Sequence, residues 1–164
     1  MFRIFTLIII FLFFNTGKYT YASNSSGQLG SIDFSTSVSG TAQKHFLHGV
    51  AALHSFWYTE ALSSFKKSVS LDPEFAMGYW GLAMAHNHPL WEEQDYQSAK
   101  AALSKINNFS KLTQREQDYI HAIRLLYDKG GKHTRDKAYS KAMKKIYHDY
   151  PNDLEAACFI AFRY

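Results

Sequence analysis

Apolar residues recur through most of the chain with the spacing of amphipathic helices. Four groups of them form stripes along helix faces: Phe46, Val50, Leu53 and Trp57; Tyr58, Ala61, Leu62, Phe65 and Val69; Tyr119, Ile120, Ile123, Leu126 and Tyr127; and Ala138, Tyr139, Ala142, Met143, Ile146 and Tyr147. No stretch alternates with the period of two that a half-buried strand would show. The pattern therefore predicts an all-α domain that begins at about Thr41.

Polar and turn residues mark where these helices should begin and end. Thr113 and Glu116 have the spacing of a capping box, in which each side chain bonds the backbone of the other residue. Pro89 should end the helix before it, because proline cannot donate the backbone hydrogen bond. Gly130 and Gly131 should separate the third and fourth stripes.

The stripes also repeat. Ala61, Phe65 and Pro73 follow one another as in the second helix of a 34-residue helical hairpin unit, and Gly49 falls at the small-residue position of its first helix. Ala83 occupies the same position in the next unit. The second-helix pattern reopens at Tyr96 about four residues late, which predicts an insertion within residues 88–94.

The stretch LHSFWYTEALSSFKKSVSLDPEFAMGYWGLAMAHNHPLW resembles a group of exported bacterial tetratricopeptide (TPR) proteins. The resemblance extends over residues 41–164, and residues 47–91 contribute most of it. It implies antiparallel helical hairpins stacked as a right-handed solenoid. Because the helix after Asp153 should leave Phe159, Ile160, Phe162 and Tyr164 facing water, we expect residues 41–164 to be an incomplete repeat domain, truncated at the C-terminus, or one half of an assembly.

The first 22 residues have the features of a secretory signal peptide. Arg3 precedes an apolar run of 11 residues, 4–14, which is too short to span a bilayer, and Thr20 and Ala22 favour cleavage after Ala22. A buried hydrophobic helix is the alternative interpretation. No cysteine follows the run, so we expect no lipoprotein anchor and no stable membrane anchor after cleavage, and a periplasmic or extracellular location. Residues 23–40, rich in Ser and Gly, should form a flexible linker.

The composition and the motifs that are missing disfavour several classes of function. Hydrophobic residues make up 46% and charged residues 20%, as in soluble globular proteins. The net charge of +4 includes Arg3 and Lys18 of the leader and is too small to favour nucleic acid. Cys158 is the single cysteine, expected as a buried thiol. No nucleophile elbow, phosphate-binding loop or dinucleotide motif occurs, so we predict neither an enzyme nor a bound cofactor.

Histidines are the unusual feature, since five of the eight lie between residues 45 and 88. His54 and His88 are one repeat apart, and the TPR resemblance places that position on the concave groove. The resemblance therefore implies a set of partner-binding residues: Phe46, His54, Trp80, Met84, Asn87 and His88. We expect a protein or extended peptide in this groove, and we name no metal site because only two histidines converge. A metal- or small-ligand-binding protein and the N-terminal part of a larger enzyme are the alternatives.

Overall fold

A computed structural model describes residues 29–161. Its seven α-helices are α1 (Gly40–His54), α2 (Tyr58–Leu71), α3 (Ala76–Ala85), α4 (Tyr96–Leu103), α5 (Gln114–Leu126), α6 (Lys132–Asp149) and α7 (Leu154–Ala161). Within the described residues, the only sheet is a ribbon of two short strands, β1 (Asn87–His88) and β2 (Glu93–Gln94), which flank the 3-10 helix η2 (Pro89–Trp91). The all-α prediction is therefore confirmed.

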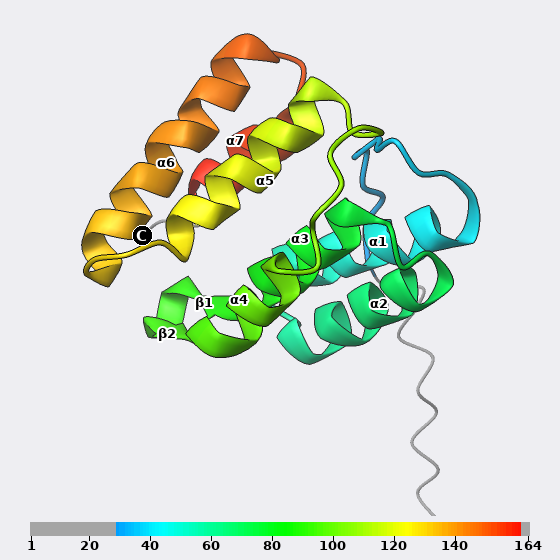
Figure 1. Cartoon of the computed structure of the whole chain (residues 1–164), viewed down its shortest axis with the longest axis horizontal. Coiled ribbons are helices and arrows are strands. Elements are labelled where there is room, and N and C mark those ends of the chain that lie inside the picture. The colour runs from blue at the N-terminus through cyan, green and yellow to red at the C-terminus, as the bar shows by residue number, and fades with distance from the viewer. Residues whose placement is uncertain (1–28, 162–164) are drawn as a thin grey trace, which may run out of the picture.

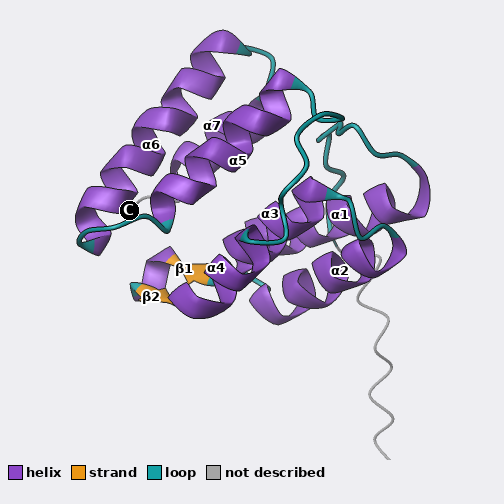
Figure 2. Ribbon diagram, viewed as in Figure 1, coloured by secondary structure: helices purple, strands orange, loops and turns teal. Residues whose placement is uncertain are grey.

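The helices pack in pairs along the chain. α1 packs against α2, α3 against α4 and α5 against α6, while α3 also contacts α1, α2 and α5. Figure 1 shows α5 and α6 side by side above the layer formed by α1 to α4, and α7 packs against α6. The β-ribbon, orange in Figure 2, projects from the junction of α3 and α4. It occupies the segment where the sequence predicts an insertion.

The predicted boundary signals lie where the sequence places them. Thr113 caps α5, with both hydrogen bonds of the capping box to Glu116 present. Gly130 and Gly131 separate α5 from α6, and Gly130 has a φ of 102°, a conformation that only glycine adopts without strain. α3 ends at Ala85, before Pro89.

Gly49, at the predicted small-residue position, lies at a close contact between helices, and so does Gly81. A Cβ atom placed on Gly49 of α1 would lie 2.6 Å from the Phe65 ring of α2, and one on Gly81 of α3 would lie 2.3 Å from the same ring. Phe65 can therefore insert between the two helices only because both positions are glycine. Ala83 is fully buried, and its carbonyl accepts a hydrogen bond from the Tyr127 hydroxyl at 2.7 Å.

Replacing Gly49 with leucine should lower the free energy of unfolding by about 2 kcal/mol, because the added atoms would overlap the fully buried Phe65 ring. Lys66→Leu on the exposed face of α2 is the control, and it should change stability little. Urea unfolding followed by circular dichroism measures both. Equal losses for the two variants would contradict the close approach.

The segment before α1 corrects one expectation. Residues 29–39 do not behave as a flexible linker, because Phe34 is buried at the centre of the core. Its ring centroid lies 5.3 Å from that of Phe46, 5.6 Å from that of Trp80 and 5.0 Å from that of Tyr119. The Ser37 amide and hydroxyl both donate to one carboxylate oxygen of Glu116, at 2.8 and 2.9 Å. The segment thus joins α1, α3 and α5.

Helix α7 brings two further corrections. Phe159, which was expected to face water, is fully buried, and its ring centroid lies 5.2 Å from that of Trp80. Cys158, which was expected to be buried, is exposed. The apolar run of this helix is nearly continuous, so its sequence did not show which face meets the core. Partial burial and the nearby Glu155 carboxylate raise the pKa of the Cys158 thiol.

None of the helices in residues 29–161 is both long enough and apolar enough to cross a membrane. The predicted signal peptide, residues 23–28 of the predicted linker, Phe162 and Tyr164 lie outside the described residues.

Candidate functional site

The six residues predicted to line a groove fall into different environments. Phe46 and Trp80 are fully buried, and Met84 and Asn87 are nearly so. Phe34 and Phe159 cover the face of α1 and α3 that we expected to be open. Phe46 and Trp80 therefore belong to the core and present no surface to a partner.

The two histidines of that set do not converge on one point. His54 Nε2 lies 2.7 Å from a carboxylate oxygen of Glu155 in α7, and the His54 ring lies against Phe159. The His88 ring stacks on Tyr58 with a centroid separation of 4.0 Å, and its Nδ1 lies 3.6 Å from a Glu93 carboxylate oxygen. Each histidine thus has its own acidic neighbour on a different element. Among the described residues, no group of three or more His, Cys, Asp or Glu side chains is placed to hold a metal ion.

Replacing His54 with alanine should cost about 2 kcal/mol of unfolding free energy, because it removes the hydrogen bond of the largely buried Glu155 carboxylate. His88→Ala should cost less than half as much, since Glu93 is mostly exposed and stays hydrated. Thermal and urea unfolding of the two single variants gives the comparison. A larger loss for His88→Ala would contradict a structural role for His54.

An open groove lies instead where α1 turns into α2 and the β-ribbon approaches it. Its volume is about 740 Å³. We call it the aromatic groove. The residues that line it are Phe56, Trp57, Tyr58, Thr59, Glu60, His88, Trp91 and Glu93. Phe56, Trp57 and Trp91 are 40%, 42% and 57% exposed, and the neighbouring Leu90 is 57% exposed. Large apolar side chains gathered at one exposed place mark interaction sites on soluble proteins.

The local backbone explains why these rings point outward. After α1, the Phe56 amide donates to the Leu53 carbonyl and the Trp57 amide donates to the Ala52 carbonyl, both at 2.9 Å. These bonds reverse the chain in a tight turn, in which Phe56 has a φ of 57°. A bulky side chain rarely adopts that left-handed conformation. The turn thus presents two successive aromatic side chains to solvent.

The β-ribbon supplies the other wall. The Asp95 amide donates to the His86 carbonyl at 2.9 Å, which closes the ribbon, and Glu92 reverses the chain with a φ of 54°. Arg135 of α6 donates to the Gln94 side chain at 2.7 Å and anchors the ribbon. Trp91 consequently stands opposite the α1–α2 turn, with its ring centroid 6.0 Å from that of Tyr58.

The charged side chains that line the aromatic groove are acidic. Its lining contains the carboxylates of Glu60 and Glu93, and no lysine or arginine among the described residues. His48 Nε2 lies 3.0 Å from one oxygen of Glu60. Burial raises the pKa of the Tyr58 hydroxyl, which therefore stays protonated and neutral at physiological pH.

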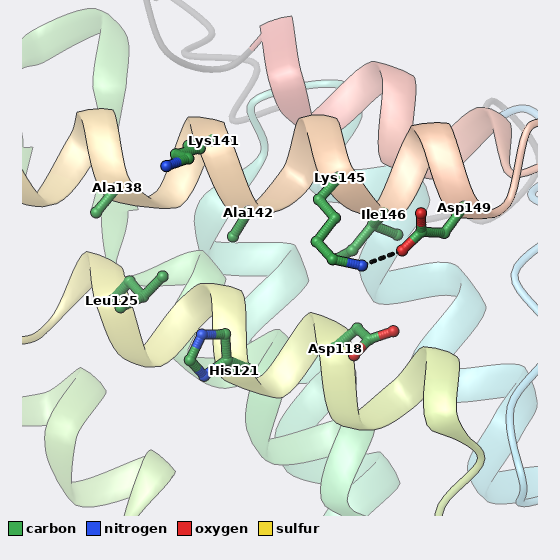
Figure 3. A pocket seen from close by; sticks show the side chains of 9 residues that line it. All are labelled: Asp118, His121, Leu125, Ala138, Lys141, Ala142, Lys145, Ile146 and Asp149. Atoms are coloured by element: carbon green, nitrogen blue, oxygen red, sulfur yellow. Dashed lines mark hydrogen bonds and ion pairs between the residues drawn. The ribbon is translucent and has the colours of Figure 1, made fainter.

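A second groove, between α5 and α6, has a volume of about 300 Å³. Figure 3 shows its floor, which Leu125, Ala138, Ala142 and Ile146 form, and the polar side chains at its edges. Those side chains carry both signs: Lys145 pairs with Asp149, and Asp118 accepts hydrogen bonds from Gln114 and Tyr150. The edge charges therefore favour neither an anionic nor a cationic ligand.

Sequence reasoning did not find the aromatic groove. The hydrophobic pattern places Trp57 in the apolar stripe of the first helix, and Trp91 falls within the predicted insertion. The available signal was three successive aromatic residues, Phe56, Trp57 and Tyr58, at a helix–helix turn, where aromatics are not needed for the turn itself. The chain matches no protein-family model, no curated protein and no solved structure.

Proposed function

We propose that this chain is an exported TPR-type scaffold that binds a protein or an extended peptide, and that the aromatic groove is its contact surface. The observation that carries the proposal is the exposure of Phe56, Trp57 and Trp91 around one groove. Tryptophan, tyrosine and other aromatics are enriched at protein interfaces, where they contribute most of the binding energy. The pairwise packing of α1 with α2, α3 with α4 and α5 with α6 agrees with a hairpin repeat.

The proposal moves the contact surface away from the predicted concave groove. Phe46 and Trp80 have no exposed surface, whereas the turn between α1 and α2 and the β-ribbon do. Export, with cleavage after Ala22, belongs to the same proposal and would place the partner in the periplasm or outside the cell. An extended segment suits an open groove better than a folded domain does.

Selection of peptides from a random display library on the immobilised protein tests the proposal. Enriched peptides should bind the double variant Trp57→Ala, Trp91→Ala at least about tenfold more weakly, as expected for the loss of two aromatic contacts. Tyr147→Ala on α6 is the matched control, because Tyr147 is 42% exposed, like Trp57, but lies outside the groove. It should leave the affinity unchanged.

Two outcomes would contradict the proposal. A library that yields no enriched peptide would argue against a peptide-binding scaffold. Peptides that bind the double variant as tightly as the unaltered protein would place the contact surface elsewhere. Circular dichroism spectra of all three proteins should coincide, since the altered side chains are exposed.

A further inference from the structure

We infer that the aromatic groove recognises an arginine side chain on its partner, an inference that rests on the proposed function and names the chemistry of the bound segment. Cations bind over aromatic faces, and arginine does so most often among protein side chains. The groove combines such faces with two carboxylates, and this combination suits a planar cation better than an apolar or an anionic group.

The rings pack edge to face against one another and leave ring surface open at the groove. The Phe56 and Tyr58 centroids are 6.5 Å apart with an interplanar angle of 63°, and the Tyr58 and Trp91 centroids are 6.0 Å apart at 79°. The rings are therefore set at steep angles to one another and do not stack face to face. Because Trp57 and Trp91 are only about half covered, each keeps surface that a ligand can reach.

The carboxylates are accessible as well as close to the rings. The Glu60 side chain is 44% exposed and the Glu93 side chain 73% exposed. Only one oxygen of Glu60 contacts His48, and Glu93 lies 3.6 Å from His88, beyond a normal hydrogen bond. Both residues therefore retain oxygens for a guanidinium group, which donates in pairs to a carboxylate.

The acidic charge of the groove disfavours anionic and purely apolar groups, which other aromatic surfaces bind. An anionic group would meet two carboxylates and no lysine or arginine among the described residues that line the groove. A purely apolar side chain would cover carboxylate oxygens without offering them a hydrogen bond, which is unfavourable. Arginine is preferred to lysine because its planar group both stacks on a ring and pairs with a carboxylate.

Two synthetic peptides test the inference: an acetylated, amidated hexapeptide Leu-Gly-Arg-Tyr-Gly-Leu, and the same peptide with citrulline in place of arginine. Citrulline has nearly the same shape and no charge. Nuclear magnetic resonance spectra of the ¹⁵N-labelled protein resolve the indole N–H groups of the three tryptophans. The arginine peptide should shift the Trp57 and Trp91 signals and leave that of the buried Trp80 unchanged, with an affinity about tenfold higher than that of the citrulline peptide.

In the double variant Glu60→Gln, Glu93→Gln, the preference for the arginine peptide should fall well below about tenfold, because only the attraction to the rings remains. Glu74→Gln, an exposed carboxylate outside the groove, is the control and should keep the preference for arginine. Thermal unfolding of each variant shows whether its fold is intact, and Glu93→Gln alone, which leaves the His48–Glu60 contact in place, replaces the double variant if that one unfolds.

Three results would overturn the inference: equal binding of the two peptides to the unaltered protein, an undiminished preference for arginine in the Gln variant, or no shift with millimolar arginine peptide. Equal binding accompanied by shifts of Trp57 and Trp91 would still support a peptide-binding groove. The inference and the proposed function can therefore fail separately.

Discussion

Replacing Phe34 with alanine should lower the free energy of unfolding by about 3–5 kcal/mol, the usual cost of removing a buried aromatic side chain. The Phe34 ring is almost fully buried and touches the rings of Phe46, Trp80 and Tyr119. The Arg115 guanidinium lies 4.6 Å from the centre of the same ring. The cavity left by the substitution would open at the junction of α1, α3 and α5, where no single helix can move to fill it.

Urea unfolding at equilibrium measures this loss, with Asp33→Ala as the control. Asp33 is the exposed neighbour of Phe34, so its removal tests the segment without touching the core. A loss below about 1 kcal/mol for Phe34→Ala would mean that the segment is only loosely attached, as its Ser- and Gly-rich composition suggests.

Replacing Asp153 with alanine should cost about 3 kcal/mol, because it removes one partner of a largely buried ion pair. The Asp153 carboxylate accepts hydrogen bonds from Arg115 Nε at 2.6 Å and from the Tyr119 hydroxyl at 2.9 Å. Its side chain is only 4% exposed, against 20% for Arg115. Burial, and then the Asp153 carboxylate itself, raise the pKa of Tyr119, so the hydroxyl stays protonated and remains the donor. Without Asp153, Arg115 Nε and the Tyr119 hydroxyl both lose their acceptor.

Two comparisons show whether the charge of Asp153 or its hydrogen bonds account for the loss of unfolding free energy. Asp153→Asn keeps an acceptor for Tyr119 and loses the charge, so its stability should fall between those of the unaltered protein and Asp153→Ala. Asp128→Ala, an exposed carboxylate after α5, should have little effect. A similar loss for Asp128→Ala and Asp153→Ala, measured by urea unfolding, would contradict the network.

The sequence predicts the local structure well because helices are determined by neighbouring residues. The capping box at Thr113 and Glu116 depends on residues three apart, and the small side chain at Gly49 depends on the repeat spacing. The same Glu116 also accepts two hydrogen bonds from Ser37, which lies 79 residues earlier. Nothing in the spacing of either residue indicates that second contact.

The candidate site could not be predicted because it too depends on contacts between residues that lie far apart in the sequence. The repeat pattern gives the face on which Phe46 and Trp80 lie, but the side chains that cover this face come from the segment before α1 and from α7. Phe34 is an isolated aromatic in a polar segment, and Phe159 lies in a helix whose apolar residues cover most of its surface. The aromatic groove depends in turn on a left-handed Phe56, and propensity disfavours that conformation.

The contacts that cover the core also determine how the chain acquires its structure. In a simple repeat array each unit touches only its neighbours, so folding can begin anywhere and spread. Here Ser37 binds Glu116 across 79 residues, and His54 binds Glu155 across 101 residues. Such distant contacts make folding slower and more nearly all-or-none, because large loops must close before the contacts form. During synthesis α1 to α4 therefore emerge before Tyr119 of α5 and Phe159 of α7, so the side of Trp80 that these two rings cover stays in contact with water until both helices have been made.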